Sequence, residues 1–330
     1  MTHNPFERSS ITAETAEFVR ELEAMLAEMP AIHEVPPEVS RKARDEGQGA
    51  FPFLPPLPEA EDLDIPGAPG GPGRVRVIRP DVAPNGVFLH IHGGGWTLGR
   101  PWHQDHRLKA LSRATGCVTV SVEYRLGPEN VWPACVEDCN AAALWLLDNA
   151  LELFGTDKIV IGGESAGAHL AATTLLSMKD AARLDRFAGA LLTYGCFDLT
   201  MTPSVANWGA RKLILSTPVI AWFTANLGVP PDQTRHPRAS PLYGDLSDMP
   251  TALFQCGTLD PLADDTAFMA ARWAQAGATQ ETIWYPGGPH AFDYFDTTLA
   301  RQAARDAVGF LTSVFGAPDS QDRNQADRHT

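Results

Sequence analysis

The sequence has 330 residues, of which 44% are hydrophobic, and carries a formal net charge of −14. This length and composition predict a soluble globular protein that is large for one domain but within the range of α/β folds with insertions. The negative charge argues against nucleic acids and anionic membranes as partners, because both repel an acidic protein.

The cysteines and the N-terminus predict a cellular location. The five cysteines are odd in number and include no C-x-x-C pair, so we expect reduced and mostly buried thiols. The first 18 residues lack the apolar core of a signal peptide, and no run approaches the roughly 18 apolar residues of a membrane span. We therefore expect a cytoplasmic protein with no membrane partner. Its assembly state stays open, with a homodimer as one alternative.

The N-terminal part of the chain predicts one helix and a connector. Residues 12–29 have apolar side chains at helical spacing, and Pro30 ends the pattern. Residues 36–73 are rich in proline and glycine and favour an extended connector, although their apolar half, "FPFLPPLP", is expected to pack against the protein.

A different pattern begins at residue 74 and predicts an α/β fold. "RVRVIRP" alternates like an edge strand, and "GVFLHIHG", "CVTVSVEY", "KIVIGG", "GALLTYG", "TALFQCG" and "ETIWYPG" follow as short apolar runs, most of them separated by helical segments. Buried strands that alternate with helices form a mostly parallel sheet flanked by helices. Residues 200–248 interrupt the alternation with two helix-like pieces and a proline-rich tail, which indicates an insertion above the carboxyl edge of the sheet. The polar residues 317–330 predict a flexible tail.

The segment "GGESAG" predicts a nucleophilic serine. It places Ser165 in a G-x-S-x-G motif between an expected strand and an expected helix, the context of a nucleophile elbow. Such a strained turn lifts the serine hydroxyl above the sheet, so the flanking residues Gly163 and Gly167 must be small. A structural serine on a tight turn is the alternative.

The segment "HIHGGGWTLG" predicts backbone donors near that serine. Three glycines after a strand allow the backbone to approach a ligand closely, so the N–H groups of Gly94, Gly95 and Ala166 can bind an oxyanion, while Gly93 shapes the turn. A plain glycine turn is the alternative. A dinucleotide site is disfavoured because G-x-G-x-x-G fails at Leu98, and no P-loop motif occurs.

Five motifs together resemble the hormone-sensitive-lipase family of α/β-hydrolases, most of which are serine esterases. They are "HGGGW", "YRLGPE", "GESAGAHLA", "DPLADD" and "PHAF", in the order of that family over roughly residues 74–315. The resemblance implies Ser165 as nucleophile, Asp260 as acid and His290 as base. It also matches Gly94 and Gly95, with Ala166, to the oxyanion hole, and implies a cap built from residues 1–73 and the insertion 200–248 around a catalytic domain of residues 74–199 and 249–316.

The residues themselves support the same triad. A serine needs a base that titrates near neutral pH and a carboxylate that orients this base, and the order Ser, Asp, His along the chain suits this sheet. Asp260 follows the strand "TALFQCG", and His290 follows "ETIWYPGGP" in a glycine–proline loop. Asp264 and Asp265 compete for the acid role but are expected to begin the next helix.

Other polar and aromatic residues allow either a functional or a structural interpretation. The pairs His90/His92 and His103/His106 suggest a metal site, but no matching ligands accompany them, and we expect no metal. His92 is expected to support the loop of residues 93–95, which we call the glycine loop. Glu164 can tune the site or orient a water, or have only a structural or solvent-facing role. Three aromatic residues of the insertion can line a pocket or only pack within the cap: Trp208, Trp222 and Phe223.

The combined prediction is a cofactor-independent serine carboxylesterase with an α/β-hydrolase fold and a helical cap, acting on small-molecule esters with short to medium acyl chains. An amidase or lactone hydrolase with the same triad, such as an arylformamidase, is the nearest alternative. A ligand-binding protein on an inactive hydrolase fold is another, although all three triad residues are present.

Overall fold

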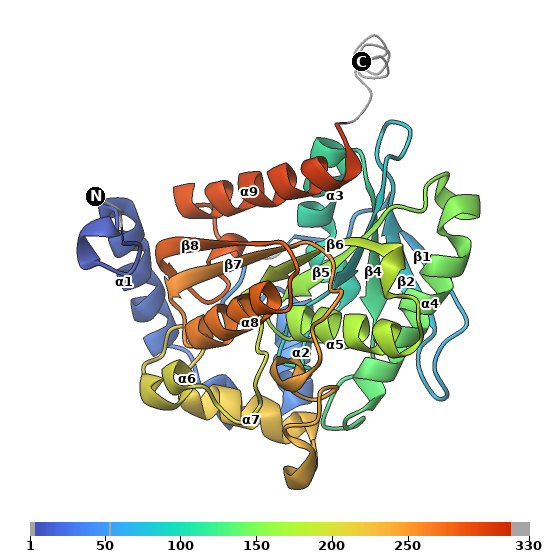
Figure 1. The fold of residues 1–330 in the computed structure, drawn as a ribbon. Helices are drawn as coiled ribbons and strands as arrows, with labels where there is room; N and C mark the ends of the chain where they lie inside the picture. Colours follow the sequence, from blue (N-terminus) through green and yellow to red (C-terminus); the bar gives the residue numbers. More distant parts are fainter. Residues whose placement is uncertain (1–3, 53, 318–330) are drawn as a thin grey trace.

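One eight-stranded sheet forms the centre of the molecule, described by a computed structural model for residues 4–52 and 54–317 (Figure 1). Its strand order is β1-β2-β4-β3-β5-β6-β7-β8. The strands are β1 (Glu61–Asp64), β2 (Arg74–Ile78), β3 (Val87–Ile91), β4 (Val118–Glu123), β5 (Ile159–Glu164), β6 (Phe187–Thr193), β7 (Ala252–Leu259) and β8 (Gln280–Pro289). β2 pairs antiparallel with β1 and β4, and all other pairs are parallel, which confirms the prediction of a mostly parallel sheet.

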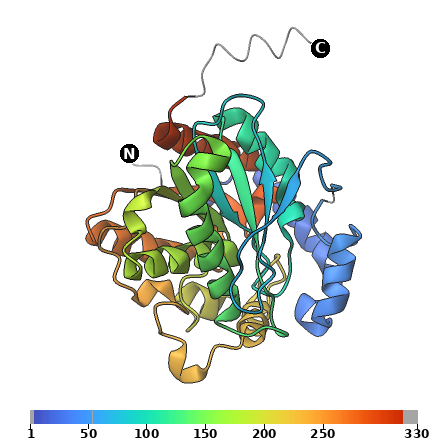
Figure 2. The same cartoon turned by 90° about the vertical axis from the view of Figure 1, so that its right-hand side faces the viewer.

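Helices cover both faces of this sheet (Figure 1, Figure 2). The α-helices are α1 (Ala13–Ala27), α2 (Pro37–Asp45), α3 (Asp105–Thr115), α4 (Ala134–Phe154), α5 (Ala166–Asp180), α6 (Pro203–Trp208), α7 (Thr217–Leu227), α8 (Ala263–Gln275) and α9 (Thr298–Phe315). α3 and α9 share one apolar cluster with the sheet, and α4, α5 and α8 share another on the opposite face. No helix among the described residues is both long and apolar enough to cross a membrane.

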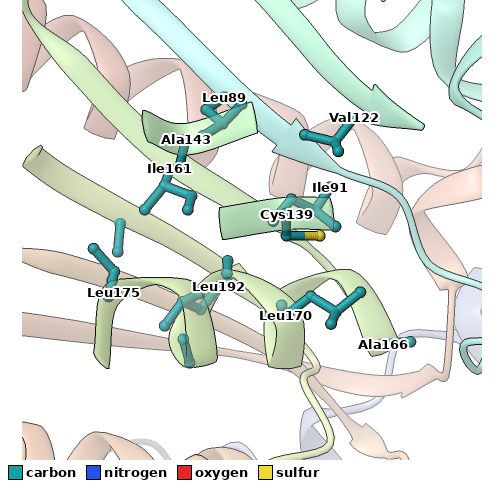
Figure 3. Packing of buried hydrophobic residues seen from close by; sticks show 14 of the residues in the cluster. Leu89, Ile91, Val122, Cys139, Ala143, Ile161, Ala166, Leu170, Leu175 and Leu192 are labelled. Carbon is teal, nitrogen blue, oxygen red and sulfur yellow. The ribbon is translucent and has the colours of Figure 1, made fainter. Parts of the chain in front are cut away.

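The larger apolar cluster holds the central strands rigidly against α4 and α5. Leu89 and Ile91 of β3 and Ile161 of β5 are fully buried and lie with Cys139 of α4 and Leu170 of α5 in one cluster (Figure 3). Burying one such leucine or isoleucine contributes about 1.5–3 kcal/mol. The loops that follow β3 and β5 therefore start from well-anchored strand ends.

Residues 200–248 contain α6, α7 and two short 3₁₀ helices, Pro231–Gln233 and Pro241–Tyr243. α7 packs onto the glycine loop after β3, because a Cβ atom on Gly95 would lie 2.2 Å from the Phe223 ring. This segment therefore lies over the carboxyl ends of the central strands.

The N-terminal helix α1 touches both the sheet edge and this segment. Thr12 caps the helix by accepting a hydrogen bond from the Thr15 N–H at 3.1 Å. Its buried face shares a cluster with Leu213 of the insertion, and Gly287 of β8 lies close to Thr15. α1 thus lies beside β8 and continues toward the insertion.

The structure differs from the sequence analysis between residues 36 and 80. The expected connector contains α2 and β1, and the expected edge strand β2 lies one position inside the sheet. Neither element has an apolar pattern: α2 has no buried residue, and β1 reads "EDLD". Arg41 holds α2 by donating to the Thr97 carbonyl at 2.7 Å, and Arg76 pairs with Asp62 of β1 at 3.0 Å. The expected tail lies, from residue 318 onward, outside the described residues.

Candidate active site

Ser165 occupies a turn that only small neighbours allow. It connects β5 to α5 with φ 57° and ψ −121°, a conformation that side chains rarely adopt and that costs on the order of 1–3 kcal/mol. A Cβ atom at Gly163 or Gly167 would lie 2.1 or 1.9 Å from the Ile91 carbonyl oxygen. Both flanking positions therefore require glycine, because the turn presses against β3.

The structure brings Ser165, His290 and Asp260 into one hydrogen-bonded chain. The Ser165 Oγ and the His290 Nε2 lie 2.9 Å apart, and the His290 Nδ1 lies 2.9 Å from the Asp260 Oδ2. Nδ1–H donates to the carboxylate, which leaves Nε2 as the acceptor of the serine proton. Asp260 and His290 are 2% and 4% exposed, so water does not compete for these bonds.

Neighbouring groups hold the Asp260 carboxylate and the His290 imidazole in place. The Leu262 N–H donates to Asp260 Oδ1 at 2.8 Å, so both carboxylate oxygens are engaged. The Tyr194 ring packs edge-on against the imidazole of His290, with 4.6 Å between ring centroids. These contacts hold the imidazole with its Nε2 toward the Ser165 Oγ.

Three backbone N–H groups near Ser165 are not used by any other group of the described protein. Gly94 and Gly95 have φ values of 124° and 59°, which glycine adopts without strain. Within residues 4–52 and 54–317, the N–H groups of Gly94, Gly95 and Ala166 have no hydrogen-bond partner, whereas the Gly93 N–H donates to Glu164 Oε1 at 2.8 Å. Ala166 also begins α5, whose N-terminus carries positive partial charge. The arrangement can stabilise a negative oxygen beside the serine.

The competing acids lie elsewhere. Asp264 and Asp265 begin α8, as expected, and accept hydrogen bonds from other backbone N–H groups: Ser204 donates to Asp264, and Phe197 to Asp265. Neither carboxylate is hydrogen-bonded to His290.

The remaining histidines do not form a metal site. Within the part of the chain that the structure describes, no group of three His, Cys, Asp or Glu residues is placed to hold a metal ion. His92 supports the glycine loop, with its Nδ1 2.9 Å from the Gly93 carbonyl oxygen. His103 instead pairs with Asp45 of α2 at 3.0 Å.

The thiols offer no rival nucleophile. All five cysteines are free and buried, as expected. Burial raises the pKa of Cys117 to about 11 and that of Cys135 to about 12, so these thiols stay protonated at neutral pH.

The sequence leaves the role of Glu164 open, and the structure excludes a role in which its side chain faces solvent. Glu164 is 6% exposed and accepts hydrogen bonds from residues far apart in the chain, including Gly93 and Tyr294. Its position next to the serine was the only signal in the sequence, because its partners come from other loops.

Comparisons with known proteins identify the same fold and related esterases. A family model described as alpha/beta hydrolase fold matches residues 88–294. Esterase LipQ of Mycobacterium tuberculosis is 31% identical over 306 residues, which cover 84% of this chain and 69% of LipQ. Carboxylesterase NlhH of the same organism is 34% identical over 245 residues, covering 71% and 75%. A solved structure, the hyperthermophilic esterase from the archaeon Pyrobaculum calidifontis, has a TM-score of 0.79 at 28% identity and covers 90% of this chain and 97% of its own.

Proposed function

Because the chain belongs to the alpha/beta hydrolase family, in its hormone-sensitive-lipase-like branch, we propose that it is a serine carboxylesterase acting on small-molecule esters. The observation that carries the proposal is the chain of 2.9 Å contacts from Ser165 through His290 to Asp260, near three N–H groups that donate to no other described residue. The names of the relatives LipQ and NlhH support ester hydrolysis in particular.

In the proposed first step, Ser165 Oγ attacks the ester carbonyl carbon while His290 Nε2 takes its proton. Asp260 stabilises the resulting imidazolium through Nδ1–H. The N–H groups of Gly94, Gly95 and Ala166 bind the oxygen on which negative charge develops. Collapse of the intermediate breaks the bond to the alcohol, which leaves with the proton from His290.

In the second step, water attacks the acyl group on Ser165. His290 now takes the proton of the water and returns it to the Ser165 oxygen when the acid leaves. The enzyme is thereby restored, and no step requires a metal or organic cofactor.

Release of p-nitrophenol from p-nitrophenyl acetate tests this function, with aryl formamides and lactones assayed in parallel. We expect the highest kcat/KM on the ester. A higher kcat/KM on the amide or lactone would replace the esterase proposal with the amidase or lactone-hydrolase alternative. Absence of any turnover would favour a ligand-binding protein. A cytoplasmic location and a homodimer stay predictions.

We expect substitution of Gly94 by valine to lower kcat about a hundredfold or more, the usual cost of losing one oxyanion donor. The added Cβ would lie 2.2 Å from the Leu98 carbonyl oxygen, so the loop must shift and carry its N–H groups with it. Steady-state kinetics on p-nitrophenyl acetate measure the effect.

Gly155→Val is the matched control, because Gly155 also has a positive φ, 73°, but no atom within 4 Å of the added Cβ. This variant is expected to lose stability through backbone strain and to keep its kcat. A folded Gly94→Val protein with unchanged kcat would remove the glycine loop from the mechanism.

The two segments proposed as a cap predict selectivity for acyl length. α7 packs over the glycine loop, with Phe223 only 8% exposed, and we expect it to form the roof of an acyl pocket of fixed size. Each buried methylene contributes about 0.8 kcal/mol, or roughly a fourfold gain in kcat/KM, until the chain meets the roof. We expect kcat/KM to rise and then fall within about two to eight carbons, a range that the family resemblance suggests.

Deletion of residues 1–35 is expected to flatten this profile and to lower the melting temperature. The deletion removes α1, whose Leu22 is packed in the same cluster as Leu213 of the insertion. Assays of a p-nitrophenyl ester series, with circular dichroism as the check on folding, measure both effects. A folded, truncated protein with the same profile would show that α1 only packs beside the sheet, and would leave residues 200–248 as the only cap.

A further inference from the structure

The carboxylate of Glu164 lies at the junction of three loops that border the candidate active site. Glu164 is the last residue of β5 and directly precedes Ser165. Its Oε1 accepts from the Gly93 N–H at 2.8 Å and from the Tyr294 hydroxyl at 3.0 Å. Gly93 begins the glycine loop, and Tyr294 lies four residues after His290. One side chain therefore connects the turn at Ser165, the glycine loop and the loop after β8 that carries His290.

Two further side chains complete this junction. Gln104 Nε2 donates to Glu164 Oε1 at 3.1 Å, and His90 Nε2 donates to Glu164 Oε2 at 3.0 Å. The other ring nitrogen of His90 lies 2.9 Å from the Ser121 hydroxyl. The carboxylate thus receives four hydrogen bonds in a buried site.

The carboxylate is ionised despite its burial. Burial by itself raises the pKa of Glu164, but the attraction to His90 and the hydrogen bonds from His90 and Gly93, with the nearby charge of Arg107, outweigh it and lower the pKa to about 2. An ionised carboxylate can only accept hydrogen bonds, which suits the four donors around it. A protonated carboxyl would direct its own O–H at one of these donors.

The contact between Glu164 and the glycine loop is also steric. A Cβ atom on Gly93 would lie 2.7 Å from the Glu164 carbonyl oxygen and 3.4 Å from the Ser165 Cβ. Because the Gly93 N–H is bound to Glu164, it cannot turn toward a substrate. The two following N–H groups, of Gly94 and Gly95, donate to no group in the described part of the chain.

We propose that Glu164 is a positioning residue, whose four hydrogen bonds fix the donors of the glycine loop relative to Ser165 and His290. It holds the geometry that the transition state requires and does not touch the substrate. The inference rests on the proposed esterase function. A displacement of about 1 Å in such a site can reduce the rate a hundredfold, because donors and reacting atoms must meet in one arrangement.

Glu164→Ala and Glu164→Gln test this proposal as a pair. The alanine variant removes all four bonds and is expected to lower kcat about a hundredfold with KM changed less than about twofold. In the glutamine variant, the amide oxygen can accept from Gly93, Gln104 and Tyr294, and its NH₂ can donate to the Nε2 of a neutral His90 that carries its proton on Nδ1. We therefore expect the glutamine variant to recover most of kcat.

A transition-state analogue separates positioning from a structural role. A trifluoromethyl ketone adds to Ser165 and forms an oxyanion that the N–H groups of the glycine loop can bind. Its inhibition constant should rise in parallel with the fall in kcat/KM across Glu164→Ala, Glu164→Asp and Glu164→Gln. Asp138→Asn is the matched control. Asp138 is a buried carboxylate away from the triad, and its Oδ2 accepts a hydrogen bond from the Arg125 backbone N–H at 2.8 Å. It should lose thermal stability and keep its kcat.

Two results would overturn the inference. One is a Glu164→Ala enzyme that loses thermal stability but keeps the kcat per active site of the parent. The other is a Glu164→Gln enzyme as impaired as Glu164→Ala with a shifted pH profile, which would assign the effect to charge. If the parent enzyme neither hydrolyses esters nor binds the ketone, the proposed function fails instead.

Discussion

Substitution of Ser165 by alanine is expected to abolish ester turnover, with a loss in kcat on the order of 10⁶. The serine hydroxyl lies 2.9 Å from the His290 Nε2, and among the described residues it is the side chain placed to give its proton to this base. The change removes one oxygen atom, and alanine, which is of similar size, takes the place of serine in a turn with a φ of 57°. The variant should therefore keep the melting temperature of the parent to within a few degrees.

Initial rates on p-nitrophenyl acetate, together with mass spectrometry for the acyl-enzyme, measure this prediction. Ser177→Ala is the matched control, because Ser177 lies on α5, the helix that follows Ser165, and its hydroxyl donates to the Thr173 carbonyl at 3.0 Å. The control should retain full activity. More than a few per cent of parental activity in a folded Ser165→Ala protein would make the nucleophile assignment wrong.

Substitution of Asp260 by asparagine is expected to lower kcat about 10⁴-fold with little change in the fold. The amide has the shape of the carboxylate but can donate to His290 Nδ1, which then holds its proton on Nε2. In that tautomer the imidazole cannot accept the Ser165 proton. The loss of negative charge also removes the stabilisation of the imidazolium that forms during attack.

The same substitution at the neighbouring acid distinguishes the candidates. Asp264 accepts from the Ser204 N–H at 2.8 Å and makes no hydrogen bond to His290, so Asp264→Asn should change kcat by less than about twofold. Equal losses in both variants would mean that the effect comes from disturbing the start of α8. A full loss only in Asp264→Asn would transfer the acid role to that residue.

The local sequence was sufficient to predict much of the central fold and of the serine turn. Strand and helix periodicity depend on which face of an element is buried, and this pattern is repeated within a few residues. The turn at Ser165 is similarly local, because the clash of a Cβ at Gly163 or Gly167 excludes larger residues there. The sheet around these elements was therefore predictable, whereas α2 and β1 were not, because charged contacts rather than an apolar face hold them.

Only the tertiary structure decided which side chains meet. Asp260 reaches His290 because each directly follows one of two neighbouring strands, β7 and β8, whereas Asp264 already lies in α8 and accepts from Ser204. Glu164 meets Gly93 and Tyr294, which are 71 and 130 residues away in sequence. Such contacts follow from the order β4-β3-β5-β6-β7-β8, and strand order is fixed by packing over the whole chain rather than by the pattern of any one segment.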